Sequence, residues 1–170
     1  MKERDKDRTA RIDATDRALV AALQADGRAT WAELGRQVGL SAPSVQERVR
    51  RLESTGVITG YHASVDPATL GLGMVALVGI HQTDSADQDD VADQLELVPE
   101  VEDCWLVAGE ETFVVKVRVA DVDALERALR ALRRVPGVAR TRTTVVISTR
   151  WQGRPLPVSA GPPASGTMER

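Results

Sequence analysis

One short segment brings hydroxyl, amide and guanidinium groups together at helical spacing. After Ser41 it runs from Ala42 to about Ser54, and its apolar residues recur at i, i+4 and i+7, which marks one buried face. Small polar groups near the start of a helix can approach base edges, and arginines further along suit phosphates or guanine. The candidate nucleic-acid contacts here are Ser41, Ser44, Gln46, Glu47, Arg48, Arg50 and Arg51.

Two capped helices with a glycine turn between them would position that segment. Thr30 and Glu33 form a capping box at the start of the first helix, and Gly39 ends it. Ser41 caps the second helix, with Pro43 in its first turn. Such a pair forms a helix-turn-helix unit, whose second helix usually lies in the major groove of DNA. A solvated charged helix face is the alternative, and the elements on both sides argue against it.

Two flanking segments complete this unit. Residues 57–65 are rich in β-forming residues and predict a two-stranded wing, in which His62 would lie near a phosphate. Upstream, residues 12–23 predict a further helix that Asp13 or Thr15 can cap. The prediction for the N-terminal part is therefore a winged helix-turn-helix domain.

Charge is distributed unevenly along the chain. Residues 1–65 contain 11 Lys and Arg against 9 Asp and Glu, whereas residues 66–151 contain 9 against 15. Only the first part suits a polyanion, and only weakly. We therefore expect DNA affinity to come from several copies of the N-terminal domain, called the head below, on one DNA rather than from one strongly basic domain.

The second half of the chain reads as strands and helices in the order β-α-β-β-α-β. Apolar patterns predict strands over residues 71–82, 101–107, 113–119 and 138–150, and helices over residues 88–98 and from Asp121 or Asp123 to about 132. Val-Pro-x-Val recurs at residues 98–101 and 135–138, where each helix would lead into a strand. This order is the ferredoxin-like arrangement. The fold class is thus α+β.

The predicted sheet needs a cover on each face. Its first strand is apolar on both faces, and helices can cover only one of them. A second copy of the same sheet is the simplest cover for the other, so we predict a homodimer through residues 70–150, with dimers of dimers where apolar surface remains. The alternative is a monomer with an imperfectly covered sheet. Lys116 and Arg118 fall on this second face, which is therefore not uniformly apolar.

Composition argues against several other classes of protein. No apolar run approaches the roughly 20 residues that cross a bilayer, so we expect no membrane partner. Residues 1–11 lack the apolar core of a secretory signal, and a single cysteine agrees with a reducing cytoplasm. The common nucleophile, metal and phosphate-loop motifs are missing, so we predict no catalytic residue, metal site or cofactor. We expect a mobile arm over 1–11, domains over 12–65 and 66–151, and a disordered tail over 152–170.

Several runs of residues stand in a specific order over residues 12–152. They are Ile12-Asp13-Ala14-Thr15-Asp16, Gly27-Arg28, Leu40-Ser41, Val45-Gln46-Glu47-Arg48-Val49-Arg50-Arg51-Leu52-Glu53, Gly56-Val57-Ile58-Thr59-Gly60-Tyr61 and Val107-Ala108-Gly109-Glu110. In this order they resemble the Lrp/AsnC family, the feast/famine transcriptional regulators, and particularly its actinobacterial members, which share a Gly-Glu-Glu turn.

The resemblance implies a mechanism and a location. The winged domain would bind double-stranded DNA as a dimer in a bacterial cytoplasm, associated with the nucleoid. The second domain, called RAM for regulation of amino-acid metabolism, would dimerise and build assemblies up to an octamer. An amino acid bound at the interface between RAM domains would change the assembly state or the DNA affinity, so the chain would be a sequence-specific transcriptional regulator with an effector.

The effector site follows from the same resemblance. In the family it is built around a Gly-Asp-aromatic-Asp turn and polar residues of the last strand. Carried over to this chain, the site consists of Gly109, Glu110, Glu111, Thr112, Thr141 and Thr143. Glu111 stands in place of the aromatic residue and Thr112 in place of the second acid. A turn with two solvated glutamates is the alternative.

Two other functions remain open from the sequence. Sirohaem decarboxylases use the same architecture and act on tetrapyrroles with histidine and basic residues, whereas this chain has two histidines, His62 and His81. An interaction module with a decayed DNA head is the third possibility, and the intact caps at Thr30 and Ser41 argue against it.

Overall fold

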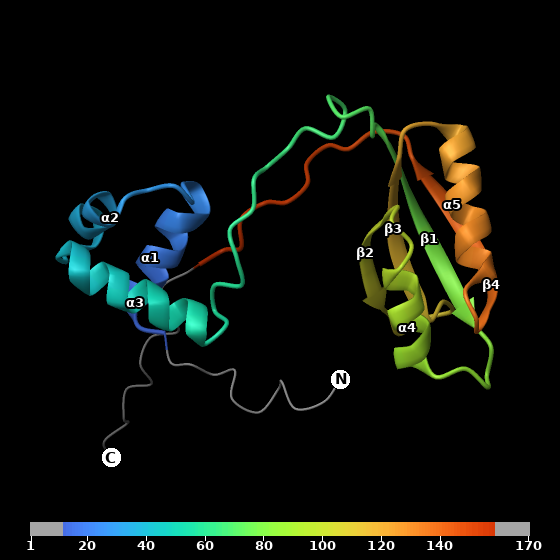
Figure 1. The fold of residues 1–170 in the computed structure, drawn as a ribbon, viewed down its shortest axis with the longest axis horizontal. Helices are drawn as coiled ribbons and strands as arrows, with labels where there is room; N and C mark the ends of the chain where they lie inside the picture. The colour runs from blue at the N-terminus through green and yellow to red at the C-terminus, as the bar shows by residue number, and fades with distance from the viewer. Residues whose placement is uncertain (1–11, 159–170) are drawn as a thin grey trace, which may run out of the picture. The chain divides into compact units, whose positions relative to one another are not determined.

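The computed structural model describes residues 12–158 in two units, one running to Ala63 and one covering Ser64–Arg150 (Figure 1). The predicted domain boundary after residue 65 lies two residues from this division. The predicted arm over 1–11 and the last part of the predicted tail, 159–170, lie outside the described residues. Residues 152–158, which belong to the predicted tail, contain no helix or strand.

The first unit is built from three helices, α1 (Ala14–Ala25), α2 (Trp31–Val38) and α3 (Ala42–Ser54). Each begins at a side-chain cap, because the first backbone N–H groups of a helix need acceptors: Asp13 caps α1, Thr30 caps α2 and Ser41 caps α3. The apolar stripes of the three helices meet in one core, whose fully buried members are Leu19, Leu34, Val45 and Val49. The tri-helical head is therefore as the periodicity predicts.

The turn between α2 and α3 depends on two glycines. Gly39 takes a φ of +71°, a left-handed conformation that side chains disfavour, and ends α2. Gly35 lies where α2 packs on the following turn, and a Cβ there would stand 2.4 Å from the carbonyl oxygen of Leu40. The short turn thus requires the absence of a side chain at residue 35 as well as at residue 39.

The predicted wing is not formed by the described residues, because residues 57–65 contain no strand. The backbone N–H groups of Val57 and Ile58 both donate to the carbonyl of Leu52, which ends α3 and directs the chain away from it. Tyr61 then donates a hydrogen bond of 3.0 Å to Glu53 Oε1 on α3. A β-ribbon needs a partner strand, and no described segment pairs with these residues, so their β propensity is not expressed.

The second unit is a four-stranded antiparallel sheet with two helices. Its elements are β1 (Met74–Gln82), α4 (Gln88–Glu96), β2 (Val101–Leu106), β3 (Phe113–Val119), α5 (Val122–Arg134) and β4 (Val138–Val146). The strand order is β2-β3-β1-β4, with every neighbouring pair antiparallel. The ferredoxin-like prediction is confirmed, and Asp121 rather than Asp123 caps α5.

Both helices cover the same face of this sheet (Figure 1). The core between sheet and helices contains alternate residues of β1 and β3 and the inward stripes of α4 and α5. The repeated Val-Pro-x-Val runs form matching turns: the N–H of Val101 donates to the carbonyl of Val98 at 3.0 Å, and that of Val138 to Val135 at 3.1 Å. The echo in the sequence therefore marks equivalent helix-to-strand joints.

The other face of the sheet is not covered by any helix and is called the open face below. Leu77 of β1 and Trp105 of β2 are 38% and 47% exposed on it. Lys116 also faces this side, yet it is nearly buried because its ammonium lies 2.9 Å from Glu102 and 3.4 Å from Asp103. The charge of Lys116 thus has its partners within the same chain. No helix within residues 12–158 has the length and apolar character to cross a membrane.

Candidate nucleic-acid interface and ligand site

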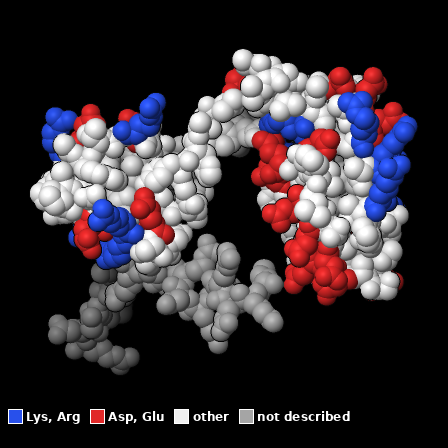
Figure 2. All heavy atoms as spheres, in the orientation of Figure 1, with Lys and Arg blue, Asp and Glu red and all other residues white. Residues whose placement is uncertain are grey.

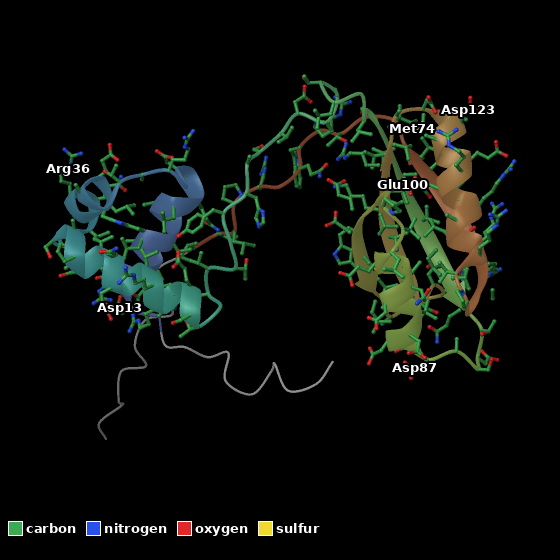
Figure 3. The ribbon with its side chains drawn as sticks, viewed as in Figure 1. Asp13, Arg36, Met74, Asp87, Glu100 and Asp123 are labelled. Carbon is green, nitrogen blue, oxygen red and sulfur yellow. The ribbon has the colours of Figure 1, made fainter. Side chains whose placement is uncertain are left out.

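The arginines of α3 divide into two groups. Arg48 and Arg51 turn toward the start of α1, where Arg48 Nη1 lies 2.7 Å from Asp13 Oδ2 and 2.8 Å from Asp16 Oδ1. Arg51 Nη2 lies 2.6 Å from Asp16 Oδ2. Asp16 is completely buried, and Asp13 lies beside α3 in Figure 3. These contacts join the first and third helices of the head.

Burial explains why Asp16 needs both arginines. A buried carboxylate without partners is strongly unfavourable, and here it accepts hydrogen bonds from two guanidinium groups and from the backbone N–H of Asp13. Asp13 is more exposed, and the hydrogen bond from the backbone of Asp16, with that from Arg48, lowers its pKa. Arg48 and Arg51 therefore join α3 to the start of α1, a role that the sequence analysis did not predict.

Arg50 belongs to the second group. It is exposed and makes no ion pair with another residue of the described chain. Ser44 and Glu47 are also exposed on α3, and Gln46 is half-buried beside them. These four side chains are presented to solvent by a helix whose opposite face is anchored in the core through Val45, Val49 and Leu52.

The remaining predicted DNA contacts are placed differently. Ser41 is the N-cap of α3, and its hydroxyl lies 2.9 Å from that of Ser44, so it serves the helix end. His62 is exposed in the irregular segment after α3 rather than in a wing. Arg36, which the sequence analysis missed, is exposed on α2 (Figure 3). The first helix of such a unit crosses the DNA backbone, which makes Arg36 a candidate phosphate contact.

The predicted effector turn packs on the open face of the second unit. The side chain of Glu111 lies across β1 at Gly79, where an added Cβ would stand 2.6 Å from Glu111 Cγ. Glu111 Oε1 lies 3.7 Å from Arg142 Nη1. Arg142 is directly opposite Gly79 in the pairing of β1 with β4, and Arg140 next to it approaches His81 at 3.5 Å. The carboxylate of Glu111 and the guanidinium of Arg142 thus lie close together at this end of the face, beside Gly79, which has no side chain.

The other predicted effector residues do not join this group within one chain. Thr141 and Thr143 pair with Ile80 and Val78, so they point to the helix-covered face, where Thr141 accepts a hydrogen bond from Arg133. The reason is strand alternation, which sends residues 141 and 143 to the face opposite that of residue 142.

The turn itself is held by backbone hydrogen bonds. The N–H of Val107 donates to the carbonyl of Thr112, and the N–H of Thr112 donates to Ile80. The hydroxyl of Thr112 accepts from the N–H of Gln82 at 3.3 Å, which ties the turn to β1. Gly109 and Glu110 are exposed at its tip. Gly79 and Arg142 lie beside Glu111 and are further candidate residues that the sequence analysis missed, and a glycine inside an apolar strand was the available signal.

The two histidines lie in different units, His62 in the first and His81 in the second. Within residues 12–158, no three side chains of the metal-binding types come together.

Comparison with known proteins covers both units. Residues 12–53 match the AsnC-type helix-turn-helix domain, and residues 74–156 match the Lrp/AsnC ligand binding domain. The HTH-type transcriptional regulator LrpA of Mycobacterium tuberculosis is 47% identical over 143 residues, which are 84% of this chain and 95% of that protein. The leucine-responsive regulatory protein of Escherichia coli is 39% identical and is matched over 80% of this chain and 85% of its own length.

Solved structures show the same likeness. A feast or famine regulatory protein from M. tuberculosis, solved in complex with L-methionine, superposes with a TM-score of 0.79 at 47% identity. The match covers 84% of this chain and 96% of that one. A transcriptional regulator from Neisseria meningitidis, also in an L-methionine complex, gives a TM-score of 0.80 at 28% identity over 86% and 97% of the two chains. This chain belongs to the Lrp/AsnC family of helix-turn-helix transcriptional regulators, and it is not an enzyme.

Proposed function

We propose that α3 reads base edges in the major groove through Ser44, Gln46, Glu47 and Arg50, while Arg48 and Arg51 hold the helix in position. The ion pairs of the arginines carry this proposal: Arg50 forms none within the described chain, whereas Arg48 and Arg51 are paired with Asp13 and Asp16. A short polar group, an amide, an acid and a guanidinium on one presented surface suit direct readout of bases, and Arg50 suits guanine or a phosphate.

Two single substitutions separate these roles. Arg50→Gln should weaken binding to duplex DNA and make it less salt-dependent, with a slope smaller by about 0.9 per lost phosphate contact, while thermal stability stays unchanged. Arg51→Gln should instead destabilise the head by about 2 kcal/mol, because buried Asp16 loses one of its two guanidinium partners. Fluorescence anisotropy with labelled duplex measures the first effect, and hydrogen exchange of the α3 amides measures the second.

The opposite pattern would contradict the assignment. If Arg51→Gln reduced the salt slope without loosening α3, Arg51 would be a phosphate contact. If Arg50→Gln left both affinity and slope unchanged, the outward face of α3 would not contact DNA.

We further infer that the second unit binds an amino-acid effector on its open face, between Glu111 and Arg142. A free amino acid carries an ammonium and a carboxylate, and this pair offers one group of opposite charge to each. The absence of a side chain at Gly79 leaves Glu111 room to lie across the sheet. The L-methionine complexes of two related proteins support this class of ligand.

Calorimetric titration of the full chain with L-methionine and a panel of other amino acids tests the site. Glu111→Gln and Arg142→Gln should each weaken effector binding tenfold or more, because each removes one of the two charge-assisted contacts. Thr143→Val is the matched control, since Thr143 points to the opposite face. Loss of binding in the control, with retention in Glu111→Gln, would show that the ligand contacts the predicted threonines instead. If no amino acid bound, the proposal of an amino-acid effector would be wrong.

Self-association completes the proposed mechanism. The open face carries exposed Leu77 and Trp105, and a second copy of the sheet would cover them. Dimers would place two heads on paired half-sites about one helical turn apart, and an effector that prefers one assembly would shift the population toward it. We expect dimers and dimers of dimers up to an octamer, acting on DNA in the bacterial cytoplasm and associated with the nucleoid.

A further inference from the structure

Charge is segregated within the second unit more sharply than the totals indicate. Residues 84–111 contain 11 Asp and Glu and no Lys or Arg, whereas residues 112–150 contain 9 Lys and Arg and 3 Asp and Glu. Figure 2 shows carboxylates gathered over α4 and β2 and arginines over α5. The net charge of this unit therefore conceals one strongly acidic part and one basic part.

The fold places these parts at opposite edges of the sheet. In the strand order β2-β3-β1-β4, β2 of the acidic segment forms one edge strand and β4 of the basic segment forms the other, while Lys116 and Arg118 of the inner strand β3 pair with Glu102 on β2. Three strand spacings separate the two edges, or about 14 Å. This distance between the edge strands exceeds the Debye length of about 8 Å at physiological salt, so the exposed carboxylates of β2 are largely screened from a polyanion at β4.

The outward face of α5 carries a row of arginines. Arg127, Arg130 and Arg134 recur at i, i+3 and i+7 and are exposed, on the side opposite the buried Leu125 and Leu132. Arg130 pairs with Glu126 at 2.6 Å, whereas Arg127 and Arg134 form no ion pair with any residue from 12 to 158. From Arg127 to Arg134 the row extends about 10 Å along the helix.

We propose that this row is a second, sequence-independent DNA contact, which binds backbone phosphates of the duplex that the heads recognise. The inference rests on the proposed function of the heads. Double-stranded DNA carries one charge per roughly 3.4 Å of each strand, so a row of this length faces about three phosphates. Guanidinium groups suit phosphate oxygens through paired hydrogen bonds.

The heads carry little net positive charge of their own. Residues 12–65 contain six arginines and six acidic residues, so this part of the chain is neutral. Two of its arginines are already committed to Asp13 and Asp16. Residues 1–11 add five basic and three acidic residues. Because non-specific affinity comes from neutralised phosphates, exposed arginines elsewhere in the chain would add to the affinity that Arg36 and Arg50 of the head provide. An acidic edge of another copy is the competing partner for the same row.

The test compares two double variants of the full chain. Arg127→Gln/Arg134→Gln removes two charges from the row, and Asp93→Asn/Glu96→Gln removes two exposed carboxylates from α4 as the matched control. Duplex binding is measured against salt for a duplex from upstream of its own gene and for a random duplex, and native mass spectrometry follows assembly without DNA. The arginine variant should lower the salt slope by about 1.8 per bound protomer on both duplexes, with roughly fivefold lower affinity per arginine.

The control variant and the assembly state decide the outcome. A contact with DNA predicts that the control leaves the salt slope as in the unmodified protein and that the arginine variant assembles normally without DNA. An unchanged slope in the arginine variant would overturn the inference while leaving the heads intact. Altered assembly without DNA would also overturn it, by assigning the row to another copy. If the unmodified chain bound no duplex at low salt, the proposed function of the heads would itself fail.

Discussion

At the scale of single residues, the buried carboxylate of Asp16 determines what the arginines of α3 can do. It accepts hydrogen bonds from Arg48 and Arg51, which leaves Arg50 as the arginine of α3 that forms no ion pair with a residue of the described chain. Periodicity within α3 correctly separated the buried stripe from the polar face. It could not divide the arginines, because their acidic partners lie 32 to 35 residues earlier in the chain.

Tyr61 offers a direct measurement of the packing after α3, since it is the only tyrosine of the chain. Burial, together with the hydrogen bond to Glu53, raises its pKa to about 12. Because this folded-state pKa lies above the unfolded value of about 10, the stabilisation is complete below about pH 10 and is lost as the pH rises toward 12. Phenolate absorbance in the near ultraviolet should titrate about two pH units higher in the folded than in the denatured protein.

The Glu53→Gln variant provides the control for that titration. It removes the charged acceptor but leaves the burial, so the folded-state pKa of Tyr61 should fall only part of the way. A folded-state titration at the unfolded value would mean that the segment after α3 does not pack on the helix.

At the scale of the elements, the close approach of α2 to the turn before α3 is the most demanding feature of the head. Gly35→Ala would place a Cβ 2.4 Å from the Leu40 carbonyl oxygen, so backbone must move. We expect a loss of about 2 kcal/mol in the stability of the head and a corresponding loss of DNA affinity. Thermal unfolding followed by circular dichroism measures the first, and duplex binding the second.

Gly27→Ala is the matched control, because a Cβ there meets only ordinary contacts at 3.7 Å. Equal stability in the two variants would show that the turn is not tightly packed. The sequence contained a signal for this position, since an isolated glycine inside a helical pattern often marks a packing requirement. The capping residues and Gly39 were enough to predict α2 and α3 without using Gly35.

The strands and helices of the second unit followed from periodicity because each has one clearly buried face. The wing did not, since β propensity in a single short segment specifies no partner. The sequence could not assign the predicted effector residues to the two faces of the sheet, for a related reason. A resemblance supplied the turn and the last strand, but only the register of β1 with β4 shows that Arg142 joins Glu111 while Thr141 and Thr143 face the helices.

At the scale of the whole molecule, the open face should determine assembly. Leu77→Glu places a carboxylate on the open face, opposite Lys116 of β3 and Thr144 of β4, and would leave it buried in a sheet-to-sheet contact. We expect this variant to dissociate to monomers in sedimentation velocity and to lose the affinity gained from linked heads, while each head still folds. Val122→Glu is the control, because Val122 is exposed at the start of α5, away from the open face.

Sedimentation of Leu77→Glu also provides the result that would contradict this prediction. An unchanged sedimentation coefficient for Leu77→Glu would show that the open face is not the dimer contact. The exposed arginines of α5 stay accessible in such a dimer, because α5 covers the face of the sheet opposite the open face.

The central claim is that α3 lies in the major groove, and methylation interference tests it most directly. A duplex from upstream of the protein's own gene is methylated at guanine N7 in the major groove and at adenine N3 in the minor groove, then bound by the full chain. We predict interference at guanines in two half-sites about one helical turn apart, or a multiple of it, with Arg50→Gln abolishing the interference at one guanine of each. Interference confined to adenine N3, or none at guanine N7, would contradict the account.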